Sequence, residues 1–164
     1  MKNTSLKKIL RPNIDPDDLY GIILDESDLF VLFAKEYDFF IDGYQVIRKE
    51  DITKFTSTKS CKYVYKILKT EGLLQNIEPP KIELSSWYSI FSSLGKNEFV
   101  IVENEEAGVF NIGPVTKINK KSMSLRYFDG TGVWEGEIKI KYTDITSVQF
   151  KNNYIKYHEK YIKP

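Results

Sequence analysis

The sequence predicts a mainly β protein with two to three short helices, built from two related halves. Tyrosine and phenylalanine are abundant, at 11 and 10 of 164 residues, and such side chains favour the pleated, half-buried surface of a sheet. The apolar residues fall largely in short runs separated by Asp, Ser and Gly, which is typical of strands joined by turns. The order of these runs also recurs 92 to 93 residues later.

The first half begins with a short segment rich in Pro and Asp, and three strands are expected after it. Residues 19–24 form an apolar run that ends in a turn at 25–28. Residues 29–33 are apolar at every position, so we expect a central strand covered on both faces. Asp42-Gly43 suits a turn ahead of the third strand, 44–48.

Two helices are expected on either side of a linker at Pro79-Pro80. The first has apolar residues at the spacing i, i+3, i+4 and stops at a glycine: Val64, Ile67, Leu68 and Gly72. The second has one apolar stripe, made by Trp87, Ile90, Phe91 and Leu94. Ser85 or Ser86 can cap its start, and Gly95 ends it. The stripe predicts a helix docked on a sheet.

The second half again reads as strands. We expect them at 98–103, 109–118, 122–127, a segment containing 138–142, and 147–157. Ile138, Ile140 and Tyr142 alternate with Lys139 and Lys141, which is typical of a strand with one face in water. The segment 129–132 (Asp-Gly-Thr-Gly) predicts a loop before that strand.

An internal repeat links the halves. Gly113 follows Gly21 by 92 residues, and each glycine opens a similar pair of strands. The same tripeptide, Asp-Ile-Thr, occurs at 51–53 and 144–146, and a short strand ending in phenylalanine follows at Phe55 and Phe150. The repeat predicts a first half at 1–78, of strands then a helix, and a second at 79–164, of a helix then five strands.

A helix followed by five short strands in about 80 residues is the layout of the Sm-like fold, a bent SH3-type sheet or small barrel. Two sets of residues carry a resemblance to a known group: 42–48 and 51–52 in the first half, and 87–94, 126–129, 132–134 and 144–146 in the second. Through them the chain resembles an uncharacterised bacterial group with two Sm-like halves. It implies a duplicated Sm-like architecture and no particular activity. The ring-forming and RNA-contacting motifs of true Sm proteins are not recognisable here.

Charge, cysteine content and hydropathy limit the expected partners and location of the protein. The formal net charge is +1, so no strong overall field attracts nucleic acid or anionic lipid, although residues 114–164 have a positive bias. A single cysteine, Cys61, allows no disulfide within the chain. The first ten residues have no signal-peptide pattern, and no run is long enough for a membrane helix. A cytoplasmic location and no membrane partner are expected.

Catalytic and metal-binding patterns are weak. His158, the one histidine, is expected in a solvated polar tail, far from Cys61 in the sequence. One Cys and one His do not make a zinc site, and the acidic residues near Pro16 suit turns or helix caps. A dinucleotide-binding loop that began at Gly130 would need its third glycine at position 135, which is Glu135, and a helix after it, where a strand is expected. Carboxylate pairs among Glu103, Glu105, Glu106, Asp38 and Asp42 are not determined by sequence. We therefore expect no enzyme, no cofactor and no metal.

Binding is the function class that the sequence favours. The expected contact residues surround the glycine-rich loop: Arg126, Tyr127, Phe128, Trp134, Lys139 and Lys141. Trp134 either projects toward a partner or folds back over the end of the sheet. We expect a protein-interaction, accessory or immunity-type module that binds another protein. The alternative is an RNA-binding Sm-like regulator, in which lysines interleaved with aromatic residues contact the nucleic acid. The sequence leaves the oligomeric state open.

Overall fold

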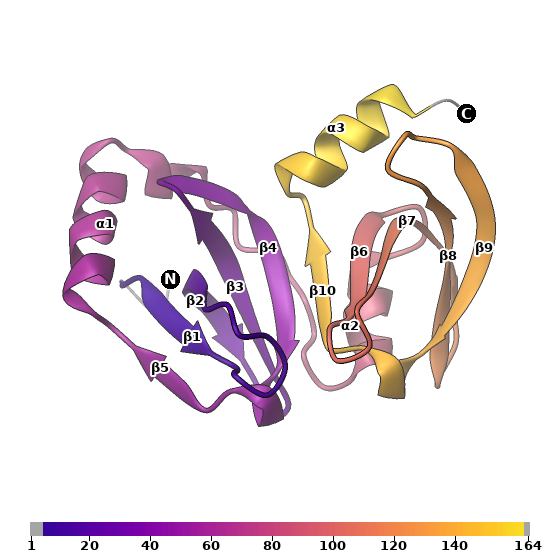
Figure 1. The fold of residues 1–164 in the computed structure, drawn as a ribbon, viewed down its shortest axis with the longest axis horizontal. Helices are drawn as coiled ribbons and strands as arrows, with labels where there is room; N and C mark the ends of the chain where they lie inside the picture. The colour runs from indigo at the N-terminus through magenta and orange to yellow at the C-terminus, as the bar shows by residue number, and fades with distance from the viewer. Residues whose placement is uncertain (1–4, 163–164) are drawn as a thin grey trace. The chain divides into compact units, whose positions relative to one another are not determined.

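The chain forms two compact units, Met1–Pro80 and Lys81–Pro164, in a computed structural model that describes residues 5–162. The division falls directly after the Pro79-Pro80 linker, two residues beyond the expected boundary. Each unit contains five antiparallel strands (Figure 1). The expectation of a mainly β protein with two to three short helices is confirmed, since residues 5–162 contain three α-helices.

The first unit is four strands, a 3-10 turn, a fifth strand and a helix. Its elements are β1 (Lys7–Leu10), β2 (Leu19–Glu26), β3 (Phe30–Tyr37), β4 (Phe40–Arg48), η1 (Lys49–Asp51), β5 (Lys54–Thr56), α1 (Lys59–Thr70) and η2 (Leu73–Asn76).

The second unit adds a helix before the same series. Its elements are α2 (Trp87–Leu94), β6 (Phe99–Asn104), β7 (Val109–Ile118), β8 (Ser122–Phe128), β9 (Trp134–Lys141), η3 (Tyr142–Asp144), β10 (Ser147–Phe150) and α3 (Asn153–Tyr161). The predicted helix α2 is confirmed: Trp87, Ile90 and Phe91 are buried, the Ser86 side chain caps its start, and Gly95 follows its end.

Both units have the same strand order. It is β5-β1-β2-β3-β4 in the first unit and β10-β6-β7-β8-β9 in the second. The described pairings do not join β4 to β5, or β9 to β10, so neither sheet closes into a barrel. Small buried clusters fill each unit. Ile9, Val31, Phe33 and Ile47 are at the centre of the first. Ile101, Ile112, Phe128 and Ile155 pack together in the second.

The repeated Asp-Ile-Thr tripeptide makes the same contacts in both units. The Thr53 N–H donates to the carbonyl oxygen of Leu10 at 2.9 Å, and the Thr146 N–H donates to that of Glu103 at 2.8 Å. Each threonine hydroxyl also donates to the same carbonyl oxygen, at 3.2 Å in both units. These contacts lead into the last strand, which pairs with the first strand of its unit. The tripeptide thus has one structural role twice.

The repeated glycines also share a role. A Cβ atom on Gly21 would lie 2.3 Å from the Phe33 ring, and one on Gly113 would lie 1.8 Å from the carbonyl oxygen of Arg126. Real Cβ atoms do not approach other heavy atoms so closely, so only glycine lets the next strand lie against the backbone here.

Two predictions for the first half are wrong. The Pro- and Asp-rich opening segment is preceded by a strand, β1, whose short run of Lys and Ile carries little periodicity. The turn expected at Asp42-Gly43 lies earlier, at Asp38 and Phe39, which both have positive φ as a two-residue hairpin of type I′ requires. Asp42 and Gly43 instead lie within β4 at a β-bulge, where Gly43 has φ of 72°.

The last predicted strand, 147–157, is confirmed over its first four residues and wrong after Phe150. The strand ends at Phe150, and residues 153–161 form the helix α3. The Asn152 side chain accepts a hydrogen bond from the Ile155 N–H at 2.9 Å, which caps the helix and stops the strand from continuing. Within residues 5–162, no helix combines the length and apolar character needed to cross a membrane.

Candidate binding surface

Helix α3 is anchored to the second sheet by one buried residue. Ile155 is 2% exposed and packs with Ile101, Ile112 and Phe128. This anchor leaves the opposite side of the helix in solvent. Tyr157 and Tyr161, one turn apart, are 66% and 72% exposed.

Aromatic rings form a continuous row from β9 across α3 to β7. Trp134 meets the Phe128 ring edge-on at 5.6 Å, and Phe128 meets His158 at 5.1 Å. His158 contacts Tyr154 at 4.6 Å, and Tyr154 contacts Phe110 edge-on at 6.0 Å. Edge-to-face and tilted contacts of this kind hold rings in fixed orientations. The row therefore fixes α3 relative to the loop between β8 and β9.

That loop, 129–133, is organised by one carboxylate. An Asp129 side-chain oxygen accepts hydrogen bonds from the Thr131 hydroxyl at 2.7 Å, the Thr131 N–H at 2.8 Å and the Val133 N–H at 3.0 Å. These hydrogen bonds stabilise the ionised form and lower the pKa of Asp129 below its ordinary value. Gly132 has φ of 78°, which lets the chain turn back toward β9. The loop is therefore preorganised.

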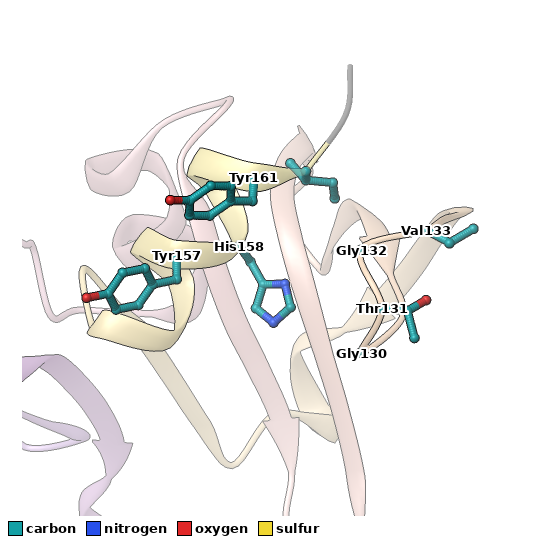
Figure 2. Close-up of a pocket in the computed structure, with 8 residues that line it drawn as sticks. Gly130, Thr131, Gly132, Val133, Tyr157, His158 and Tyr161 are labelled. Carbon is teal, nitrogen blue, oxygen red and sulfur yellow. The ribbon is translucent and has the colours of Figure 1, made fainter.

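A shallow depression of about 460 Å³ lies between this loop and α3. Gly130, Thr131, Gly132 and Val133 line one side, and Tyr157, His158, Tyr161 and Ile162 line the other. Figure 2 shows His158 projecting from the helix toward the loop, with Tyr157 and Tyr161 together on another side of the helix. The depression therefore has the loop on one side and aromatic side chains of α3 on the other.

The predicted contact residues on β8 and β9 divide into four groups, the last of which is the pair Lys139 and Lys141. Arg126 and Trp134 lie together: the guanidinium is 3.9 Å from the centre of the indole ring, a cation–π contact. Trp134 folds back on the sheet and is half-buried. Phe128 is 4% exposed, so its ring supports the surface from below. Tyr127 is half-buried and lies opposite Gly136.

Lys139 and Lys141 lie farther along β9. They are exposed and stand opposite Ser124 and Ser122, on the face of the strand pair that also carries Arg126. Glu137 is on this face too, and it forms a salt bridge of 3.0 Å with Lys117. The structure thus separates an aromatic region near α3 from a charged region on β9.

The residues considered for catalysis are engaged in packing or in hydrogen bonds. Cys61 is buried in α1 of the first unit, whereas His158 belongs to α3 of the second. His158 is half-buried among rings, so the prediction of a solvated tail is wrong. A Glu105 side-chain oxygen accepts from the Thr146 hydroxyl at 2.8 Å, and one of Glu103 accepts from the Gln149 amide at 2.6 Å.

A second depression, of about 410 Å³, lies in the first unit. Leu6, Tyr20, Glu36, Tyr37, Asp38, Ser60, Cys61 and Val64 line it. Burial raises the pKa of Glu36 above its ordinary value, and the nearby Asp38 adds to this effect. Among residues 5–162, no cluster of three or more His, Cys, Asp or Glu side chains is arranged to hold a metal ion.

Sequence reasoning missed α3 and the role of Asp129. The signals were present: Asn152 is a favourable helix cap, and Ile155 and Ile162 are spaced by seven residues. Asp followed by Gly-Thr-Gly is typical of a side chain that closes its own loop.

Comparison with protein-family models, curated proteins and solved structures gives no match for this chain.

Proposed function

We propose that this protein is a non-enzymatic protein-interaction module whose contact surface is the exposed side of α3 together with the loop 129–133. The observation that carries this proposal is the exposure of Tyr157 and Tyr161, at 66% and 72%, beside a preorganised loop. Large exposed tyrosines on a rigid support are typical of the residues that dominate binding energy in protein interfaces. The net charge of +1 also leaves short-range contacts, rather than a strong field, to select the partner.

In the same proposal the two units are duplicated Sm-like sheets, and the chain belongs with two-domain proteins of that kind. The shared strand order and the matching threonine contacts support it. We also propose that the protein catalyses no reaction, holds no cofactor and acts in the cytoplasm.

Site-specific photocrosslinking tests the contact surface. A photoreactive phenylalanine analogue replaces Tyr157 in the full chain, and the crosslinked protein is identified from the native host. The matched control carries the analogue at Tyr63, which is 65% exposed on α1. We expect a defined adduct from position 157 and not from position 63.

The identified partner is then purified and titrated against variants. Replacing both tyrosines, Tyr157→Ala and Tyr161→Ala, removes two contact side chains, so we expect the affinity to fall at least about tenfold. Tyr63→Ala is expected to leave the affinity unchanged. Equal adducts from both positions, or an affinity that the double variant does not alter, would sink the proposal.

The second candidate function is RNA binding. It is favoured by Arg126, Lys139 and Lys141 sharing one face of β8 and β9. Filter binding with single-stranded RNA in a salt series distinguishes it, because phosphate contacts release counterions and weaken steeply as salt rises. Binding at low salt that is lost in the double variant Lys139→Glu, Lys141→Glu would favour RNA. No retention at low salt would remove this candidate.

A further inference from the structure

Strand β9 has an outer side that its own sheet does not use. It is the last strand in the order of the second unit, and β8 is its neighbour among the described strands of that unit. A strand in this position presents a row of N–H and C=O groups to which another strand can pair.

The direction of those groups follows from one hydrogen bond. The Tyr142 N–H donates to the carbonyl oxygen of Lys121 at 3.1 Å, just beyond the opposed pair Ser122 and Lys141. In an antiparallel ladder, hydrogen-bonded and non-hydrogen-bonded pairs alternate. The backbone groups of Ile138 and Ile140 therefore point toward β8, and those of Glu137, Lys139 and Lys141 point outward.

The side chains of β9 alternate in character as well as in direction. Glu137, Lys139 and Lys141 are exposed on one face, whereas Ile138 and Ile140 are half-buried on the other. The two isoleucines border a depression of about 180 Å³. The charged face changes sign along the strand, from glutamate to lysine, and this change makes the strand complementary to its own reverse.

We propose that β9 pairs antiparallel with β9 of a second copy of this chain, about a two-fold axis at Ile138. In this register Glu137 of each copy stands opposite Lys139 of the other, and the outward backbone groups of these residues meet as a hydrogen-bonded pair. Glu135 lies toward Lys141 of the other copy. Ile138 faces its own equivalent and adds apolar cover at the half-buried face.

Other registers are disfavoured by charge. An axis at Glu137 opposes two glutamates, and an axis at Lys139 opposes two lysines, both of which destabilise a strand pair. An axis between two residues places an isoleucine opposite a charged residue, glutamate or lysine, and brings inward-pointing backbone groups against outward-pointing ones. The register at Ile138 combines opposite charges with matched backbone groups. It also gives a closed, isologous dimer.

A charge swap in the full chain tests this register without any other partner, so its outcome is independent of the proposed interaction surface on α3. Sedimentation velocity over a concentration series gives the dimer dissociation constant. Lys139→Glu places two like-charge pairs in each dimer, so we expect the dissociation constant to rise at least about tenfold. The double variant Glu137→Lys, Lys139→Glu restores opposite charges and is expected to recover the dimer. Lys62→Glu, the same charge change on an exposed residue of α1, is the control and is expected to behave as the wild type.

Disulfide trapping reads the axis directly. Two Ile138→Cys copies place the new thiols on opposed Cβ atoms of a non-hydrogen-bonded pair, which suits a disulfide across strands. We expect a covalent dimer on mild oxidation, and none from Thr131→Cys, with circular dichroism confirming that each variant is folded. A monomeric wild type at all concentrations, a double variant that stays monomeric while Lys139→Glu is folded, or equal crosslinking at 131 and 138 would overturn the proposal.

Discussion

The two units share a framework and differ in what they attach to it. Both have the same strand order, the same close approach at a glycine, and the same threonine contact before the last strand. Their fourth strands in sequence differ sharply. β4 has four consecutive buried residues, 44–47, whereas β9 alternates between half-buried and exposed residues along its whole length. The framework sets the fold, and the proposed contact surface and the proposed pairing strand β9 lie in the parts that differ.

The helices that follow the last strands make the same point. Thr58 caps α1 and Asn152 caps α3, and in each helix the third residue after the cap is buried: Cys61 and Ile155. The anchor positions match, but the exposed sides do not. Tyr157 and Tyr161 stand together on α3 beside the loop 129–133. The second unit therefore carries the proposed contact surface.

The strongest test of the shared framework is the pair of glycines. Gly113→Ala forces a Cβ against a backbone carbonyl that cannot move alone, so we expect a loss of more than about 3 kcal/mol in the free energy of unfolding. Gly21→Ala meets the Phe33 ring first, which can rotate, so we expect about 2 kcal/mol. Gly130→Ala, in open space, is the control. Denaturant titration measures all three, and equal losses at 21, 113 and 130 would contradict a shared role.

Removing the helix anchors ranks next. Ile155→Ala deletes buried carbons from the cluster with Ile101 and Phe128, so we expect a loss of about 3 kcal/mol. Cys61→Ala removes one sulfur from α1 and is expected to cost about 1 kcal/mol. Both are read by thermal and denaturant unfolding. A negligible effect of Ile155→Ala would mean that α3 is not held by this contact.

These helices show how far sequence reasoning reached. Long apolar runs and the stripe of α2 determined most elements correctly, because burial of one face dominates their energetics. The prediction for the residues after Phe150 was wrong because Tyr and Ile also suit strands. A single capping side chain, that of Asn152, decides that this segment forms a helix. The internal repeat could have predicted α3, because a helix also follows the last strand of the first unit. The arrangement of the candidate site was missed for a similar reason. The ring contacts between β8, β9 and α3 depend on tertiary packing that no local sequence pattern shows.

The repeated threonines are expected to give a smaller, unequal effect. Thr146 is buried, and its one hydroxyl hydrogen is shared between the carbonyl oxygen of Glu103 and a side-chain oxygen of Glu105, while the hydroxyl oxygen accepts from the Glu105 N–H. Thr53 is exposed, and its hydroxyl donates to the carbonyl oxygen of Leu10. Thr146→Val removes a buried hydroxyl from three hydrogen bonds, so we expect a loss of about 2 kcal/mol, against about 0.5 kcal/mol for Thr53→Val, which removes one exposed hydrogen bond. Equal losses in chemical denaturation would show that the surroundings of the two tripeptides matter less than their shared contact.

The smallest expected effects concern the hairpin loops that occupy matched places, 38–39 between β3 and β4 and 129–133 between β8 and β9. Burial raises the pKa of Glu36 beside the first loop, so the folded chain binds more protons there than the unfolded chain. Its contribution to stability is present below the ordinary glutamate pKa, at about 4.3, and is lost as pH rises through the raised pKa. Glu36→Gln keeps an acceptor for the Phe39 N–H and removes the charge, so this variant is expected to exceed the wild type in stability near neutral pH and to match it in acid.

Asp129 in the second loop has the opposite sign. Hydrogen bonds lower its pKa, so its contribution is present above the ordinary aspartate pKa, at about 3.9, and is lost as pH falls through the lowered pKa. Asp129→Asn is therefore expected to be less stable than the wild type near neutral pH, with the gap narrowing in acid. Denaturant midpoints at several pH values compare both variants with the wild type. If both differences kept the same sign, or neither changed with pH, the two carboxylates would not organise their loops in the opposed ways that their surroundings indicate.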